Sequence, residues 1–109
     1  MFCFRLACDC GYESEDACWG EKPWSGHTTV IIPIYNPLMG RICEHEISST
    51  EWAEVGEQTS LWFQKHGASI RDLYGEKATV LIPIEYDKPI MACPKCGRQS
   101  CRAIVTGIV

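Results

Sequence analysis

The stretch Cys93-Pro94-Lys95-Cys96-Gly97 is the part of the sequence on which the predicted fold depends. Its two cysteines stand three positions apart, so a tight turn between them can point both thiolates at one ion. Pro94 sets φ for the first turn position, and Gly97 can adopt the positive φ that turns the chain away. A structural zinc site needs four such donors, usually from two short pairs that folding brings together. The stretch therefore predicts half of a tetrahedral zinc site.

A second short pair lies near the other end of the chain, in Cys8-Asp9-Cys10-Gly11. One residue separates these cysteines, where two to four are usual, but Gly11 follows Cys10 as Gly97 follows Cys96. A site made of thiolates alone is closed and structural, because a catalytic zinc normally keeps one position open for water. We therefore predict a structural Zn²⁺ site with the ligands Cys8, Cys10, Cys93 and Cys96.

A competing ligand set comes from Cys43-Glu44-His45, whose Cys-x-His spacing could complete a Cys3His site with Cys93 and Cys96. It would leave the first cysteine pair free. It ranks second because it lacks the glycine that follows each of the other two pairs. The remaining cysteines have no paired spacing and are expected to be small buried side chains or free thiols. They are Cys3, Cys18, Cys43 and Cys101.

Together the two cysteine pairs resemble the knuckles of the zinc-ribbon superfamily, especially its small members with a Cys-Pro-x-Cys-Gly knuckle. The resemblance covers residues 1–12 and 90–109 and implies two hairpin knuckles that clamp one zinc ion. This sequence departs from the pattern in its shorter first pair and in residues 13–89, which we interpret as an inserted sheet and helix. We expect residues 1–109 to form a single domain.

The composition is that of a folded protein, with 46% hydrophobic and 22% charged residues among 109. Ten Lys and Arg against 14 Asp and Glu give a net charge of −4. Binding to nucleic acid depends on many Lys and Arg contacts to phosphates, so this charge disfavours it. A small basic patch around the second knuckle nevertheless keeps nucleic acid as an alternative partner. It consists of Lys95, Arg98 and Arg102.

The sequence contains no apolar run long enough to span a bilayer, and residues 1–8 are too short and interrupted for a signal peptide. We therefore expect a cytoplasmic protein without a membrane partner. In a reducing compartment, eight cysteines are more typical of metal ligands and free thiols than of disulfides. A secreted domain with four disulfides is the minor alternative.

Apolar and β-branched stretches predict strands over residues 2–8, 28–35, 40–47, 79–84 and 102–109. The runs Thr29–Ile34 and Thr79–Ile84 are near copies, and we expect them to be neighbours in one antiparallel sheet. Each run contains a proline, Pro33 or Pro83, which predicts a sheet edge or a bulge at that position. Between the first two strands, Trp19 and Trp24 lie in a segment rich in turn residues, where we expect them to cap the core beneath a loop.

One main helix is predicted after Ser48, whose hydroxyl and Glu51 form a capping-box pattern. Apolar residues at helical spacing extend it over about 14–16 residues, and Gly67 is a plausible left-handed stop. A short helical turn is expected over residues 69–74. The predicted fold class is therefore α+β: an antiparallel sheet with one main helix, its termini joined by the metal site.

For function, the sequence favours a protein-interaction module whose metal holds a surface that meets another protein. The alternatives are a nucleic-acid-binding zinc ribbon and a thiol-redox or metal-dependent enzyme. Reactive Cys-x-x-Cys pairs usually begin a helix, whereas this pair precedes Gly97 and a predicted strand. We predict no catalytic residues, because no catalytic motif contains His27, His45 or His66, and the acidic segment 13–16 is most simply surface.

Overall fold

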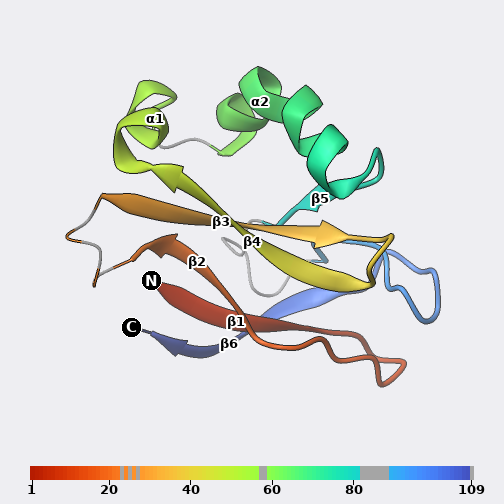
Figure 1. The fold of residues 1–109 in the computed structure, drawn as a ribbon. Helices are drawn as coiled ribbons and strands as arrows, with labels where there is room; N and C mark the ends of the chain where they lie inside the picture. Colours follow the sequence, from red (N-terminus) through yellow and green to blue (C-terminus); the bar gives the residue numbers. More distant parts are fainter. Residues whose placement is uncertain (23, 25, 27, 57–58, 82–88, 109) are drawn as a thin grey trace.

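The computed structural model describes residues 1–22, 24, 26, 28–56, 59–81 and 89–108, and its described part is an α+β structure, as predicted (Figure 1). Six antiparallel strands and two helices, of which the second is the main one, make up this part. They are β1 (Phe2–Ala7), β2 (Ala17–Glu21), β3 (Thr29–Asn36), β4 (Arg41–Ser48), α1 (Ser49–Glu54), α2 (Thr59–Tyr74), β5 (Thr79–Val80) and β6 (Arg102–Ile108). No described helix has both the length and the apolar composition needed to cross a membrane.

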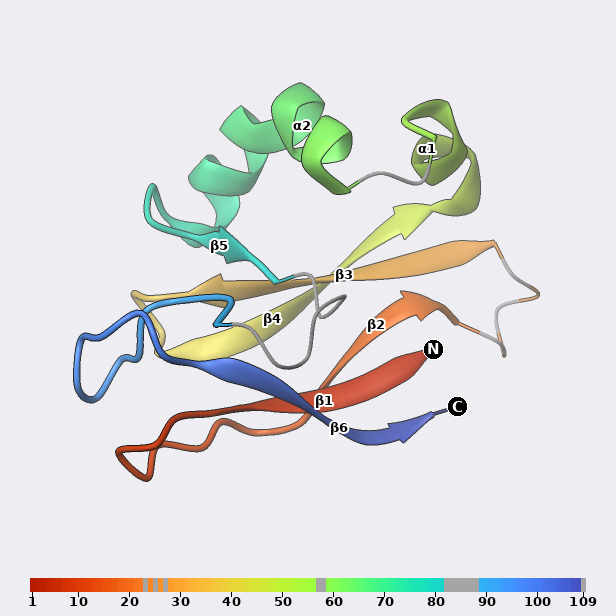
Figure 2. The same cartoon turned by 180° about the vertical axis from the view of Figure 1, so that it is seen from behind.

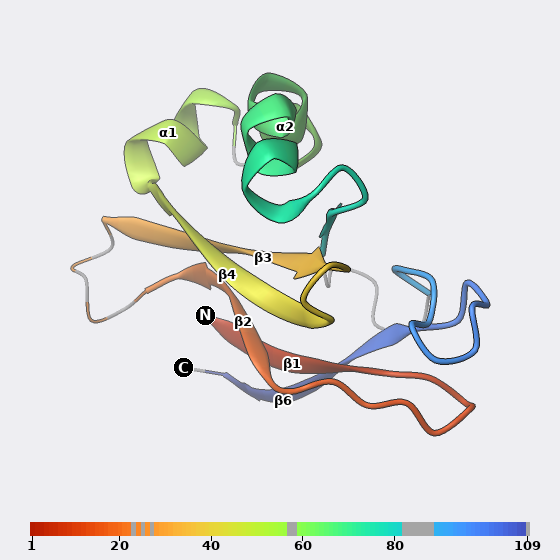
Figure 3. The ribbon, with the colours of Figure 1, turned by 45° about the vertical axis from the view of Figure 1, so that its right-hand side comes forward.

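The strands follow the order β4-β3-β2-β1-β6, and β5 pairs with β3 outside this path. Helices α1 and α2 cover one face of β3 and β4, while β1 and β6 lie on the opposite side (Figures 1 and 3). Strand β3 is consequently the central element. Its residues from Val30 to Asn36 are all buried, because alternate side chains face the helices and the β1–β6 layer.

Two clusters of buried side chains fill the space on either side of β3. The cluster beneath the helices contains Val30, Ile32, Ile34, Ile47, Trp52, Val55, Trp62 and Ile70. The cluster toward β1 and β6 contains Phe4, Leu6, Ala17, Tyr35, Ile42, Leu81, Met91, Cys93, Cys101 and Ala103. The second cluster reaches the predicted metal-binding segments, because Cys93 belongs to it and Cys8, Cys10 and Cys96 pack against it.

The strands predicted over residues 28–35 and 40–47 are confirmed as β3 and β4, and they form a hairpin with Thr29 opposite Ser48 and Asn36 opposite Arg41. The buried side chain of Asn36 accepts hydrogen bonds from the backbone N–H groups of Leu38 and Met39, at 3.0 and 3.3 Å, and so shapes the turn. The two similar runs are also neighbours, since Ile34 pairs with Val80. The end of the second run, including Pro83, lies outside the described residues.

The prediction of an edge or bulge at Pro33 is wrong. Strand β3 is central and keeps its register with β4 throughout. On its other side, pairing with β2 ends at Ile31 and pairing with β5 begins at Ile34. The Pro33 carbonyl accepts a hydrogen bond from Leu81 N at 2.9 Å. The N–H group that Pro33 lacks therefore lies in the gap between the β2 pairing and the β5 pairing, so its absence removes no hydrogen bond from either pair.

The single predicted helix is two helices. The capping interaction at Ser48 is confirmed, because its hydroxyl accepts a hydrogen bond from Glu51 N at 3.1 Å. Helix α1 ends before Gly56, whose φ is 62°. Gly67 does not end the helix: it is buried inside α2, which includes the predicted turn at 69–74 and ends at Tyr74, just before Gly75, whose φ is 99°. Ile70, a residue of α2, packs into the core cluster beneath the helices, and this packing stabilises the helix beyond Gly67.

The segment 17–21 is strand β2, not a turn-rich loop, and it corrects two predictions. Trp19 lies in this strand and packs against both core clusters, with its ring edge-on to that of Trp52 at 6.4 Å between centroids. Trp24 is 66% exposed, so it does not cap the core. Only one of the two tryptophans therefore contributes to the core.

Cys3 and Cys18 form a disulfide, whereas the sequence predicted two unpaired thiols. They stand directly opposite each other in the β1–β2 pair, with their Cα atoms 4.1 Å apart. Such a short separation is typical of the non-hydrogen-bonded positions of an antiparallel ladder. The other six cysteines carry free thiols.

Replacing Cys3 by serine should lower the free energy of unfolding by about 2–3 kcal/mol, because the bond closes a loop of sequence separation 15 and restricts the unfolded chain. Denaturant titration measures this change, with Cys43→Ser as the control for loss of an unpaired thiol. Dithiothreitol should bring the wild type to the stability of the variant. A wild type that is indifferent to the reductant would show that the bond does not stabilise the fold.

Replacing Gly75 by alanine should cost about 1–2 kcal/mol, because L-residues with a side chain are strained at positive φ. The added Cβ would also lie 3.2 Å from Leu38 Cδ1. Gly107→Ala is the matched control, since its Cβ would meet no atom within 4 Å and its φ is not positive. Thermal unfolding of both variants tests the prediction, and equal melting temperatures would contradict it.

Candidate metal centre

The first cysteine pair lies in the turn that follows β1. Backbone hydrogen bonds from Cys8 N to Tyr12 O and from Gly11 N to Cys8 O, both 3.0 Å, close this turn. Gly11 has φ 97°, a conformation that favours glycine. The role inferred for Gly11 from the sequence is therefore confirmed, and the turn holds Cys8 and Cys10 at the same end of the hairpin.

The second pair lies in a turn closed by hydrogen bonds from Cys93 N to Arg98 O, at 2.7 Å, and from Gly97 N to Cys93 O, at 2.9 Å. Gly97 has the positive φ expected from the sequence, 76°. The backbone N–H groups of Lys95 and Cys96 point to Cys93 Sγ, at 3.4 and 3.5 Å. These contacts fix the position of the Cys93 sulfur within the turn.

The two turns meet because β1 pairs with β6 and so brings the chain ends together (Figure 2). Ala7, just before the first pair, stands opposite Arg102, just after the second. Residues 90 and 91, which precede the second pair, are held to Cys101, the residue just before β6. The hydrogen bonds run from Ile90 N to Cys101 O and from Cys101 N to Met91 O, at 2.8 and 3.2 Å. The register of β1 against β6, together with these two bonds, therefore places the two cysteine turns side by side.

The four sulfur atoms form one cluster. Cys8 Sγ lies 3.8 Å from Cys96 Sγ, and Cys10 Sγ lies 3.6 Å from Cys93 Sγ. All four lie within 4.8 Å of one another. A tetrahedral ion with metal–sulfur bonds of about 2.3 Å separates its ligands by roughly 3.8 Å, whereas a disulfide needs about 2.05 Å. The cluster therefore has the dimensions of a four-thiolate metal site.

The thiol pKa values show how the cluster is charged. A backbone hydrogen bond and the side chain of Arg98 lower the pKa of Cys96 to about 6. The pKa of Cys8 is also lowered, first by the backbone of Cys10 and then by the Ser100 hydroxyl. For Cys10, a backbone hydrogen bond from Tyr12 lowers the pKa, but desolvation and the neighbouring thiols outweigh it and raise the value to about 11.

This spread of pKa values is expected when several thiols surround one point. The first thiolates form readily, and each further thiolate must ionise beside the negative charges already present. A divalent cation removes that repulsion and displaces the remaining protons. Cys101 differs, since burial raises its pKa to about 12, and it stays a neutral thiol beneath the cluster.

Ser100 is a member of the site that the sequence analysis missed. Its Oγ lies 2.9 Å from Cys8 Sγ and 3.8 Å from Cys96 Sγ, so it touches one cysteine of each pair. No local signal identifies it, because a serine four residues after a cysteine is ordinary in a loop. Its contact with Cys8 arises only when the chain ends meet.

The residues of the competing ligand set lie elsewhere. His45 lies in β4 and its side chain contacts α2: its Nδ1 is 2.8 Å from the Tyr74 hydroxyl, and its ring centroid is 5.7 Å from that of Trp62. Burial lowers the pKa of His45 and favours its neutral form. Among the described residues, neither Cys43 nor His45 belongs to the sulfur cluster.

The other polar residues named from the sequence are also placed. His66 Nε2 lies 3.1 Å from a Glu51 carboxylate oxygen, and His27 lies outside the described residues. In the acidic segment, Glu15 is exposed and its carboxylate accepts a hydrogen bond from Ile42 N at 2.9 Å. The basic residues around the second turn are all exposed. They are Lys95, Arg98 and Arg102.

Comparison with protein-family models, with curated proteins and with solved structures finds no match to this chain. The likeness to zinc ribbons therefore rests on the four-cysteine cluster and the two glycine-ended turns that join the N-terminal and C-terminal regions.

Replacing Ser100 by alanine should weaken zinc binding by about 10- to 100-fold, as is typical when a group that supports a ligand is lost. Competition with a chromophoric chelator measures the affinity. Gln99→Ala, an exposed neighbour in the same loop, should bind zinc like the wild type. Equal affinities for Ser100→Ala and the wild type would show that the hydroxyl does not support the ligands.

Proposed function

We propose that this chain is a small zinc protein in which Cys8, Cys10, Cys93 and Cys96 hold a structural Zn²⁺, and that it acts as a protein-interaction module. The observation that carries the proposal is the clustering of four thiols from opposite ends of the chain within 4.8 Å. A further basis is the pair of turns, which supply N–H donors and positive φ at the positions a zinc knuckle needs.

Zinc is the proposed ion because of the donor set. Thiolate ligands select soft or borderline metals, and four sulfurs at tetrahedral spacing are typical of structural zinc sites. All four coordination positions are taken by protein, so no position is left for water or substrate. This favours a structural role over a catalytic one.

The ion would stabilise residues 92–100, which form no helix or strand. Residues 92–100 form turns and bends, and their link to the first hairpin runs mainly through the sulfur cluster. Metal binding converts such a link into folding free energy, because the unfolded chain has no preformed site. Removal of the ion should therefore loosen this segment first.

An interaction role is supported by the apolar surface. Two neighbouring apolar side chains in the turn between β3 and β4, Leu38 and Met39, are 83% and 57% exposed. Apolar side chains that are exposed side by side can contribute to a binding face. The proposed location is the cytoplasm, where reduction would leave Cys3 and Cys18 as two thiols facing each other across β1 and β2.

The test is metal analysis of purified protein. We expect one zinc per chain in the wild type, and substoichiometric zinc with a lowered melting temperature in Cys8→Ser and Cys10→Ser. Zinc loading should fade as the pH falls, because protons compete for the thiolates. Cobalt-loaded protein should show the sulfur-to-metal charge-transfer and d–d absorption of a tetrahedral thiolate site.

Cys43→Ser and His45→Ala are the matched controls and should keep their zinc. Retention of zinc by both first-pair variants, together with its loss in His45→Ala, would overturn the proposed ligand set. A wild type that contains no zinc after purification and does not take up added zinc would overturn the proposal itself.

A further inference from the structure

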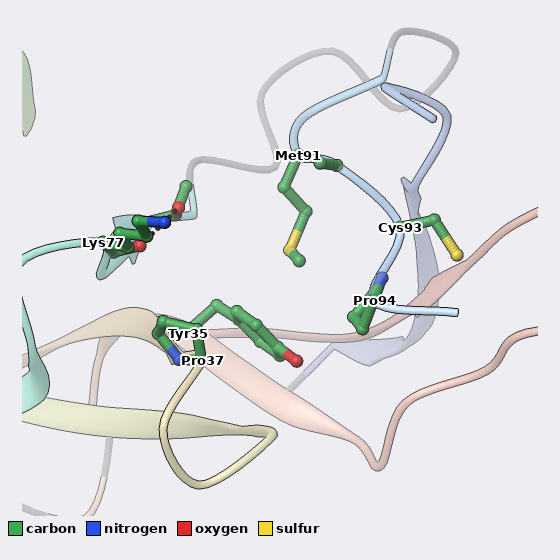
Figure 4. A pocket seen from close by; sticks show the side chains of 8 residues that line it. Tyr35, Pro37, Lys77, Met91, Cys93 and Pro94 are labelled. Carbon is green, nitrogen blue, oxygen red and sulfur yellow. Dashed lines mark hydrogen bonds between the residues drawn. The ribbon is translucent and has the colours of Figure 1, made fainter. Parts of the chain in front are cut away.

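A cleft of about 350 Å³ lies directly beside the second cysteine turn (Figure 4). It is formed where the end of β3, the start of β5 and the segment 91–94 come together. Its lining residues are Tyr35, Pro37, Lys77, Thr79, Met91, Ala92, Cys93 and Pro94. The volume is at the lower end of the range for ligand sites and suits one or two apolar side chains.

The inner surface of the cleft is apolar. The side chains of Tyr35 and Met91 approach it from opposite sides, and both residues are 6% exposed (Figure 4). Pro37 and Pro94 are exposed at its entrance. Methionine adapts its shape to different apolar partners, and proline loses little conformational entropy when it is covered. These features favour insertion of an apolar side chain.

The rim of the cleft carries a positive charge. Lys77 is exposed and makes no ion pair with any of the described residues. The whole chain has a net charge of −4, so an exposed lysine here differs from the average surface. Lys95, also exposed, follows Pro94 of the cleft wall. Charge complementarity therefore favours a negatively charged group next to the apolar side chain.

One wall of the cleft belongs to the metal centre. Cys93 lines the cleft and its sulfur belongs to the four-cysteine cluster. The adjoining Met91 is held by the hydrogen bond that its carbonyl accepts from Cys101 N. A metal bound by Cys93 would therefore hold Met91, Ala92 and Pro94 in place, and the cleft would depend on the ion.

We propose that this cleft binds a short segment of a partner protein in which an apolar side chain lies next to an acidic residue. The apolar side chain fills the space between Tyr35 and Met91, and the carboxylate lies at Lys77. The exposed Leu38 and Met39, which follow Pro37, extend the apolar surface beyond the cleft. This inference rests on the proposed interaction function and names the chemistry of its partner.

The experiment is a titration of ¹⁵N-labelled, zinc-loaded protein with peptides of the form acetyl-Ser-Gly-X-Z-Gly-Ser-amide. X is Leu, Phe or Trp, and Z is Glu or Lys. Peptides with Glu should shift the backbone amides of Lys77, Met91 and Ala92 and bind about two- to fivefold more tightly than those with Lys, the range for an exposed ion pair. Lys77→Glu should reverse this preference.

Lys65→Glu is the matched control, since Lys65 is an exposed lysine of α2 that does not line the cleft. It should keep the preference of the wild type. Removal of zinc with a chelator should abolish the peptide-induced shifts at Met91 and Ala92.

Two results would overturn the inference: no peptide shifts the cleft amides, or Lys77→Glu keeps the preference for Glu. Zinc content is measured on the same samples, so failure of the cleft proposal can be distinguished from failure of the proposed function. Zinc-loaded, folded protein that ignores the peptides refutes the cleft alone. Peptide binding that shifts amides of β6 refutes the cleft and leaves an interaction role in place.

Discussion

The antiparallel pairing of β1 with β6 is the interaction on which the arrangement of this protein depends. Fully buried side chains of β1, Phe4 and Leu6, stand opposite Val105 and Ala103, and this register aligns the ends of the two strands. Because Ala7 then faces Arg102, the turn after β1 and the loop before β6 lie together. Without that register, the four cysteines would be two unrelated pairs.

The four-cysteine cluster is an extension of the core. Cys93 belongs to the same core cluster as Phe4, Leu6 and Cys101, and Cys8, Cys10 and Cys96 pack against that core cluster. Partial burial strengthens electrostatic interactions with the thiolates, since the local dielectric constant is lower than that of water. Partial burial also raises the free energy of a cluster that holds several negative charges without a cation. Burial and charge therefore act together to favour an occupied site.

Strand β3 explains how one short chain supports two cores. Its alternate side chains contribute Ile32 and Ile34 to the helix side and Tyr35 to the other. The same strand ends at the cleft, where Tyr35 forms part of the surface beside Cys93. The cleft is thus built on the most deeply buried strand and on the proposed metal turn, two supports that restrict its movement.

Sequence reasoning succeeded where the deciding forces are local. Strands β1, β3, β4, β5 and β6 and the cap at Ser48 follow from side-chain alternation and backbone preferences within a few residues, whereas β2 was predicted as a loop. The helix stop was wrongly placed at Gly67, because glycine ends a helix only where the residues beyond it have nothing to bury. Ile70 is 1% exposed, so α2 continues to Tyr74. Pro33 was misjudged because its effect depends on which strand lies beside it.

The amino-acid sequence alone determined the conformations of the two cysteine turns. Gly11 and Gly97 adopt left-handed backbone angles that few other residues tolerate. That the two turns meet was also predicted, because a four-thiolate site needs two such pairs, and the four sulfur atoms do cluster. The Cys3–Cys18 bond, the contact of Ser100 with Cys8 and the cleft at Cys93 came only from the folded chain. Each joins segments far apart in sequence, and strand register, which no local pattern encodes, decides whether they touch.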